Sequence, residues 1–191
     1  MSQPAIAICD GTAGDFVRLW TSPAFGEMGV DVTQEMLAGA ISGNVVTSFD
    51  VEGAHVEALP LPAGIAAVWL LRLSTEDEAP LDEAVVHDLD TVIVIYTADD
   101  LLLWYNKAYE RVLGPNAHLL KTGTPFAEIM AAAYRAGHAA TGGEDIDTLI
   151  ARRLARHQAC ETFEEALADG RRLKTEEIAT ASGILGVRNE I

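Results

Sequence analysis

The sequence predicts an α+β chain that contains two copies of one fold. Two stretches share an outline, an apolar strand-like run that leads directly into a helix-like segment: VRLWTSPAFGEMG at 17–29 and LLLWYNKAYERVLG at 101–114. Both halves also end in three strand-like segments separated by turn residues. An offset of 84 residues (104 − 20 = 84) aligns Trp20 with Trp104 and sets Ser22 opposite Asn106. The simplest interpretation is two copies of one fold, the first of them shorter.

The second half shows its elements most clearly. In DEAPLDEAVVHDLD (77–90), apolar residues recur at helical spacing among acidic ones, which predicts an amphipathic helix entered after Pro80. The β-branched run at 91–97 and the apolar run at 101–105 predict two strands joined by a turn. Asn106 follows at an N-cap position, so we expect its side-chain oxygen to accept hydrogen bonds from the first-turn amides of the next helix.

Two further helices and three strands complete this half. Gly114-Pro115 is expected to end the helix that begins after Asn106. The Ala, Glu and Met content of 126–137 favours a helix, and a second amphipathic helix is expected at 144–158, after Gly142-Gly143. Three strands then follow, at 161–168, 171–180 and 184–191, with hairpin turns at Asp169-Gly170 and Ser182-Gly183.

The first half repeats this order in a shorter form. Two strands and two helical segments are expected first, at 5–9, 16–20, 23–29 and 33–41. Three strands follow, at 44–51, 54–61 and 65–73. The predicted organisation is therefore a first domain at 1–75, a linker with an amphipathic helix at 76–90, and a second domain at 91–191.

The acidic composition argues against several classes of partner. The chain has 29 Asp and Glu residues and 13 Lys and Arg residues, which gives a formal net charge of −16. Such a surface repels phosphate backbones and anionic lipid, so neither nucleic-acid binding nor membrane contact is expected. The apolar runs are too short to span a bilayer, and no signal peptide is recognised. Cys9 and Cys160 lie far apart in the sequence, so no disulfide framework is expected. We therefore expect a cytoplasmic protein.

The second half resembles the PAS sensory-domain family along nearly its whole length. The matching stretches are VIVIYTADDLLLWYNKAYERVLG (92–114), TGTPFAEIM (122–130) and FEEALADGRRLKTEEIATASGILGVRNEI (163–191). An Asn at the end of the second strand is typical of that family, as is the Asp-Gly-Arg hairpin found here at 169–171. Asn189-Glu190-Ile191 stands where the family's last strand commonly ends in Asp-Ile-Thr. The first half lacks the Asn, and Ser22 is the residue that could cap in its place.

The resemblance implies tandem PAS-like domains, each a five-stranded antiparallel sheet with helices on one face. It also implies a sensory or protein-interaction module of a bacterial signal-transduction protein, such as the sensor histidine kinase of a two-component system. Such a module passes a signal to a kinase output domain by dimerisation or docking, so its partners are a second copy of the chain and signalling proteins. The alternative function is a small-molecule or cofactor receptor whose occupied pocket drives the signal.

The sequence contains no recognisable catalytic set. We find no nucleophile–base pair, metal-ligand spacing or phosphate loop, so the region is not expected to be an enzyme. Haem-binding members of the family take an iron ligand from a long helix, a place that His138 or His157 could occupy. An exposed histidine at a helix end is the plainer interpretation of both, so no cofactor is expected, although haem or a small ligand stays open. Arginines of RRLAR (152–156) are interpreted as a solvated face.

Two groups of apolar residues are candidates for binding. One could line a small-ligand pocket between sheet and helices, although core packing explains it equally well: Tyr105, Phe126, Met130, Tyr134 and Leu149. The other lies on one side of the expected helix at 81–89: Leu81, Val85, Val86 and Leu89. This stripe can cover its own sheet or pair with a second copy. Because salt screens the repulsion between two acidic chains, we expect a weak dimer that tightens with added salt.

Overall fold

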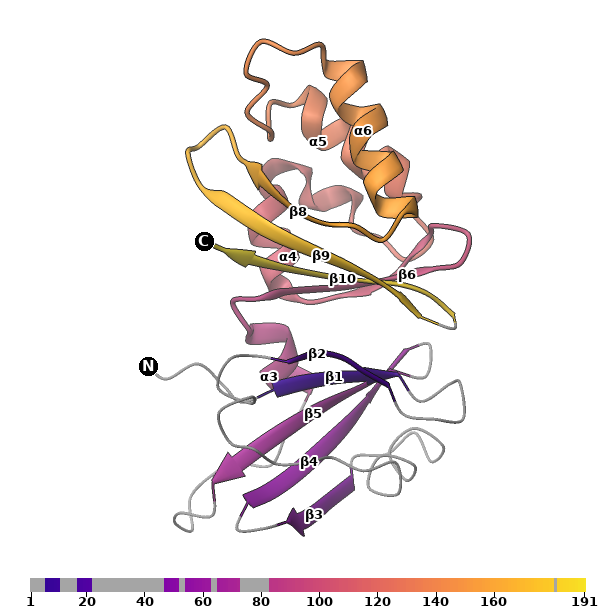
Figure 1. The fold of residues 1–191 in the computed structure, drawn as a ribbon, viewed down its shortest axis with the longest axis vertical. Helices are drawn as coiled ribbons and strands as arrows, with labels where there is room; N and C mark the ends of the chain where they lie inside the picture. Colours follow the sequence, from indigo (N-terminus) through magenta and orange to yellow (C-terminus); the bar gives the residue numbers. More distant parts are fainter. Residues whose placement is uncertain are drawn as a thin grey trace. The chain divides into compact units, whose positions relative to one another are not determined.

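The computed structural model describes residues 6–10, 17–21, 47–51, 54–62, 65–72, 83–180 and 182–191. These residues fall into two compact units, Met1–Val86 and His87–Ile191 (Figure 1). The boundary between the units lies inside a short helix, α3 (Glu83–Asp88). Each unit is described below by itself.

The second unit contains a five-stranded antiparallel sheet. Its strands are β6 (Val92–Thr97), β7 (Leu102–Tyr105), β8 (Thr162–Ala166), β9 (Arg172–Thr180) and β10 (Gly183–Glu190). They are arranged in the order β7-β6-β10-β9-β8, so the first and last strands of the unit lie side by side at its centre. Every neighbouring pair is antiparallel, as the resemblance implied.

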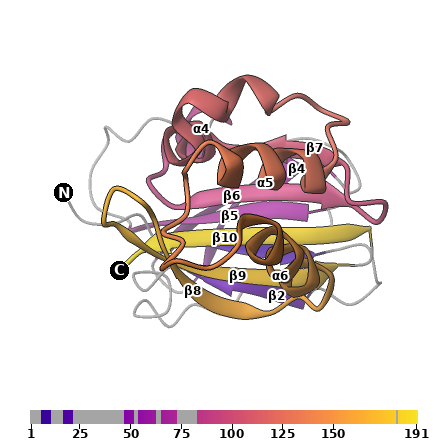
Figure 2. The ribbon, with the colours of Figure 1, turned by 90° about the horizontal axis from the view of Figure 1, so that it is seen from above.

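The chain between β7 and β8 forms the helical layer. It contains α4 (Lys107–Leu113), a 3-10 helix η2 (Gly114–Leu119), α5 (Phe126–Arg135) and α6 (Ile146–Gln158). Seen from above, α5 and α6 lie over strands of the sheet (Figure 2). Alternate side chains of β6, namely Val92, Val94 and Tyr96, join a core with buried residues of these helices. The core of the unit therefore lies between the sheet and the helices.

Local sequence explains where these helices begin and end. Gly114 adopts a left-handed conformation (φ 53°) and ends α4, as predicted. Asp145 caps α6, because its side chain accepts a hydrogen bond from the Thr148 amide at 3.1 Å. The 3-10 helix was not predicted. Its six residues, with Pro115 at the start, are too few to show an apolar period.

The predicted helix at 77–90 is shorter in the described residues. Helix α3 ends at Asp88, and Leu89 and Asp90 lead into β6 without helical structure. The chain straightens here because it must enter the sheet at Val92. None of the helices that the structure describes is both long and apolar enough to cross a membrane.

The first unit contains a sheet with the same strand order. Its strands are β1 (Ile6–Asp10), β2 (Val17–Thr21), β3 (Thr47–Val51), β4 (Ala54–Leu61) and β5 (Ile65–Arg72). The order β2-β1-β5-β4-β3 matches that of the second sheet strand for strand. All five strands were predicted to within a few residues. The helical segments predicted at 23–29 and 33–41, and Ser22, lie outside the described residues.

The two sheets also share an irregularity beside the aligned tryptophans. Trp20 pairs with Ile8, and the register of β1 shifts between Ile8 and Cys9. Trp104 pairs with Ile95, and the register of β6 shifts immediately after it, between Ile95 and Tyr96. The repeat seen in the sequence thus corresponds to a bulge at the same point of the first hairpin in each sheet.

We expect Gly183→Ala to destabilise the second unit. An added Cβ would lie 1.9 Å from the carbonyl oxygen of Tyr96 and 2.7 Å from the carbonyl carbon of Thr97. These are backbone atoms of the neighbouring strand, which cannot change rotamer as a side chain can. The free energy of unfolding should therefore fall by about 1–3 kcal/mol. Urea unfolding measures this. Gly186→Ala is the matched comparison and should cost less, because its Cβ would meet a side-chain atom, Cγ1 of Val94. Equal losses for both variants would contradict the prediction.

Candidate functional site

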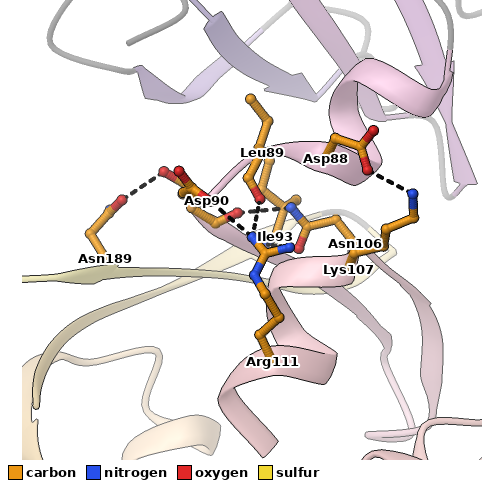
Figure 3. Close-up of polar contacts among 9 residues, drawn as sticks. Asp88, Leu89, Asp90, Ile93, Asn106, Lys107, Arg111 and Asn189 are labelled. Atoms are coloured by element: carbon orange, nitrogen blue, oxygen red, sulfur yellow. Dashed lines mark hydrogen bonds and ion pairs between the residues drawn. The ribbon is translucent and has the colours of Figure 1, made fainter. Parts of the chain in front are cut away.

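A set of polar contacts joins the segment that enters the second sheet to α4 and to the end of β10 (Figure 3). We refer to this set as the entry clasp. Its members are Asp88, Leu89, Asp90, Thr91, Ile93, Asn106, Lys107, Arg111 and Asn189. The bonded residues are up to 98 positions apart in the sequence.

Asn106 is the buried centre of the entry clasp. Its side-chain oxygen accepts from the amide of Ile93 at 3.0 Å, and its Nδ2 donates to the carbonyl of Thr91 at 2.8 Å. Its backbone amide also donates to the carbonyl of Ile93 at 3.0 Å. Asn106 does occupy the N-cap position of α4, but the predicted side-chain cap is absent. The amide side chain instead bonds the buried backbone amide of Ile93 in β6 and the half-buried backbone carbonyl of Thr91, just before that strand.

Two basic residues of α4 hold the segment before β6. The Arg111 guanidinium donates to the carbonyl of Leu89 at 3.0 Å and to the carboxylate of Asp90 at 3.1 Å. Lys107 lies 2.6 Å from the carboxylate of Asp88, and this hydrogen bond and charge lower the pKa of Asp88. All of these charged groups are exposed, so water and salt compete with the contacts. The segment before β6 is therefore held by weak, exposed contacts of Lys107 and Arg111, which surround the buried side chain of Asn106.

The entry clasp also reaches the last strand. The hydroxyl of Thr91 donates to the side-chain oxygen of Asn189 at 2.8 Å. Thr91 immediately precedes β6, and Asn189 immediately follows Arg188, which pairs with Val92 at the start of β6. The entry to the unit and its exit are thus linked by side chains.

A second polar group lies in the core, where α6 faces β9. Arg153 and Glu177 are 2% and 3% exposed and form two hydrogen bonds, Nη1 to Oε2 at 3.2 Å and Nη2 to Oε1 at 2.5 Å. His157 is also buried, with its Nδ1 3.1 Å from the Glu177 carboxylate and its Nε2 3.5 Å from Asp100. Burial acts to raise the pKa of Glu177, but His157 and Arg153 outweigh it and lower that pKa to about 2.

These buried positions correct two expectations. Arg153 belongs to the RRLAR cluster, yet its guanidinium lies over the rings of Phe126 and Phe163, at 4.8 and 4.9 Å, rather than on a solvated face. His157 is not an exposed helix-end residue, because its ring stacks on that of Phe126 with centroids 3.7 Å apart. Its Nδ1 and Nε2 lie within ion-pair distance of Glu177 and Asp100, although neither nitrogen forms a hydrogen bond with a described residue. His138 lies half-buried after α5, where burial lowers its pKa.

Arg188 is a buried cation of a different kind. It is 2% exposed on β10, and its guanidinium lies 4.9 Å from the centre of the Tyr109 ring. Neither its Nε nor its Nη2 has a hydrogen-bond partner among the described residues, and no described carboxylate lies within ion-pair distance. Burial acts to lower the pKa of Arg188, yet neighbouring groups, Tyr109 and Glu165 first, raise it above its ordinary value. Arg188 is therefore charged.

The balance of energies makes this arrangement unusual. A desolvated cation–π contact contributes about 2 kcal/mol. Removing a guanidinium-sized ion from water costs several kcal/mol. The Tyr109 ring alone therefore does not offset the burial of Arg188.

Thr175 lies beside Arg188 and, like it, has a buried polar group without a hydrogen-bond partner among the described residues. The two residues are paired across β9 and β10, so both side chains project from the same face of the sheet. Arg188 is also paired with Val92 of β6, whose side chain is part of the core beneath the helices, which places both on the helix-facing side. Thr175 is fully buried, and its hydroxyl, too, has no hydrogen-bond partner in the described part of the chain.

Other hydroxyl groups of this core are partnered. The Tyr96 and Tyr109 hydroxyls lie 2.9 Å apart, and burial raises the pKa of Tyr96 well above its ordinary value. The Tyr134 hydroxyl donates to the Glu165 carboxylate at 2.8 Å, and burial, with the charge of Glu165, raises its pKa. The phenols of Tyr96 and Tyr134 are consequently neutral at pH 7.

The structure places most of the predicted pocket residues together. Phe126, Met130 and Tyr134 are buried in the core of the second unit, and Tyr105 packs against it half-buried. Leu149 is buried on α6. The predicted pocket residues did not include Glu177 or Arg188, and His157 and Arg153 were interpreted only as a possible haem ligand and as part of a solvated face. A usable signal was present, since 149, 153 and 157 share one helical face and 173, 175 and 177 alternate with half-buried positions on β9.

The predicted dimer residues are only partly described. Val86 and Leu89 are buried, Leu81 lies outside the described residues, and the side chain of Val85 is not described. The ring of His87, between them, lies 5.0 Å from that of Trp104. Among the described residues, no group of three or more His, Cys, Asp or Glu side chains is placed to hold a metal ion.

Comparison with known proteins adds the following. A family model described as the PAS fold matches residues 86–185, which is 100 of the 191 residues (185 − 86 + 1 = 100). No curated protein matches the chain. Among solved structures, the crystal structure of an uncharacterized protein from Mycobacterium tuberculosis is similar, with 10% sequence identity and a TM-score of 0.44. That similarity covers 96% of this chain and 62% of the other, so this chain spans less than two thirds of its length.

Proposed function

This chain belongs to the PAS-fold family, and we propose that it is a sensory module that passes a signal to an output domain by dimerisation or docking. Domains of this family are generally non-catalytic sensory or interaction modules. The output domain we propose, on family grounds, is that of a sensor histidine kinase. The chain itself then supplies no chemistry, and its partners are a second copy and other signalling proteins.

The entry clasp is the observation that supports this proposal. A signalling module has to convert a change in its core into a movement of the segment that connects it to its neighbours. Here α4 contacts the core through Tyr109 and holds that segment through Lys107 and Arg111. Because these outer contacts are exposed and weak, a small displacement of α4 would break them before it broke the hydrogen bonds of Asn106.

We further propose that the first unit is a second, shortened PAS-like domain, at 1–75. The matching strand order of the two sheets supports this, as does the bulge beside Trp20 and Trp104 in each. The tandem arrangement would give one chain two modules with related docking faces.

Hydrogen exchange tests the role of the entry clasp. Replacing Arg111 with Gln removes the charge that holds Leu89 and Asp90, so amide exchange at 86–91 should become faster by about threefold to tenfold. Exchange in β9 should stay unchanged. Arg135→Gln is the matched control, because Arg135 forms a similarly exposed ion pair with Asp147, away from the entry segment. The proposal fails if both variants leave exchange at 86–91 as it is in the wild type.

Sedimentation equilibrium tests dimerisation. We expect the wild-type chain to associate weakly and more tightly in high salt, because salt screens the charge of −16 on each copy. Val85→Asp should weaken association at both salt concentrations if the apolar stripe of the expected helix is the contact. Ala84→Asp adds the same charge at the preceding position of α3, and salt should restore its association. A wild type that stays monomeric at high protein and salt concentrations argues against the dimer.

A small-molecule receptor is the second candidate function. The observation that favours it is the buried, charged Arg188, whose Nε and Nη2 have no partner among the residues described.

A further inference from the structure

We propose that the second unit binds a small monocarboxylate at Arg188 and Thr175, between the sheet and the helices. This inference rests on the proposed sensory function and names the class of molecule that would be sensed. It concerns residues that were not among the predicted pocket residues.

The geometry of the guanidinium indicates a carboxylate. Nε and Nη2 are the two nitrogens along one edge of the group, and together they present two parallel N–H bonds. This edge binds both oxygens of a carboxylate at once. Arg153 shows the contrast, since its two terminal nitrogens already hold both oxygens of Glu177. Arg188 is therefore a carboxylate-binding group whose partner is not supplied by the described residues.

Thr175 completes the donor set. Its hydroxyl is buried beside Arg188 on the adjacent strand, on the same face of the sheet, and within the described residues it has no partner. A hydroxyl at this place can donate to one oxygen of an anion that the guanidinium holds. Two side chains on the same face of the sheet, both at least nine-tenths buried, thus have hydrogen-bonding groups without a partner among the described residues.

The surroundings restrict the ligand further. Arg188 lies over an aromatic ring, and the adjoining core is formed by apolar and phenolic side chains, which suit a compact apolar body. Arg188 supplies one positive charge, and Thr175 supplies a neutral hydroxyl. The second negative charge of a dicarboxylate or of phosphate would therefore be buried without a counter-ion, so a monocarboxylate fits better.

The same site is connected to the entry clasp by two elements. Tyr109, under the guanidinium, belongs to α4, which also carries Lys107 and Arg111. Arg188 directly precedes Asn189, which accepts the hydrogen bond from Thr91. A carboxylate that draws Arg188 away from Tyr109 would therefore act on both α4 and the end of β10.

Thermal unfolding of the 191-residue chain tests the site with sodium propionate and sodium benzoate as probes. Sodium chloride and sodium phosphate at equal ionic strength, and the neutral propionamide, are the comparisons. We expect a saturating rise in the melting temperature with at least one of the two carboxylates and none with the amide or the other salts. No response to either carboxylate, or an equal response to propionamide, phosphate or chloride, overturns the proposal.

Two variants locate the response. Arg188→Met keeps most of the side-chain volume and should weaken binding by about 10- to 100-fold, whereas Thr175→Val should weaken it by about 3- to 10-fold. Arg135→Met, at an exposed arginine, should leave it unchanged. An unaltered response of Arg188→Met overturns the proposal, and if that variant does not fold, an unaltered response of Thr175→Val does so. Faster exchange at 86–91 in Arg111→Gln without any carboxylate response would reject this site and keep the proposed sensory function.

Discussion

Glu177→Gln is expected to lower the free energy of unfolding of the second unit by about 3–5 kcal/mol at pH 7. The amide removes the negative charge that Arg153 and His157 both approach, and it leaves the Arg153 guanidinium buried without a counter-ion. Urea unfolding followed by circular dichroism measures the loss. Glu176→Gln is the matched control, because that neighbouring residue pairs with the partly exposed Lys174 and its loss should change stability little.

The same variant should change the dependence of stability on pH. The pKa of Glu177 is lowered from its ordinary value of 4.5 to about 2 in the folded chain. A carboxyl group with a lowered folded pKa stabilises the fold above its unfolded pKa, and this contribution is lost as the pH falls through the folded value. Wild type should therefore lose stability between pH 4.5 and 2 through this group, by about 3 kcal/mol, and Glu177→Gln should lack this loss.

A double substitution separates charge from packing. Replacing Arg153 with Met and Glu177 with Leu removes both charges and keeps apolar volume, so it should recover most of the stability lost in Glu177→Gln. If the double variant is as unstable as the single one, the loss reflects packing around these side chains rather than an unpaired charge.

Asn106→Ala is expected to destabilise the second unit by about 2–4 kcal/mol. The substitution leaves the buried amide of Ile93 and the half-buried carbonyl of Thr91 without their side-chain partner, and an unpaired buried group costs about 1–3 kcal/mol. Asn106→Asp should also be destabilising, since a carboxylate can accept from Ile93 but cannot donate to Thr91. Urea unfolding is the measurement, with the half-buried Asn116→Ala as the control. A loss below about 0.5 kcal/mol for Asn106→Ala would show that water replaces the side chain.

The sequence was sufficient to predict the elements of the second sheet, because their signals are local. Alternation along β9 and the β-branched run of β6 are readable from a few residues. The position of Asn106 at the start of α4 was predicted for the same reason. Its hydrogen bonds were not, because the groups that it binds lie 13 and 15 residues earlier, and strand pairing brings them close.

The buried charges were the part that local reasoning could not find. Arg153 lies among arginines that are exposed or half-buried, and its counter-ion, Glu177, lies 24 residues away in the sequence. Arg188 was not recognised because a single arginine in a strand resembles an ordinary surface residue until the neighbouring strands are known. Long-range pairing decides the environment of both residues, and a single sequence carries no direct record of it.

The side-by-side placement of β6 and β10 has a mechanical consequence. The chain enters β6 and leaves β10 at the same end of an antiparallel pair, next to the Thr91–Asn189 hydrogen bond. A pulling force applied to both ends of the unit would load that bond first and then separate the strands one pair at a time, as a zipper opens. Strands loaded in this way resist far less than strands sheared along their length, because their bonds break in succession. Tension along the chain would thus open the unit at its entry before it disturbed the helices.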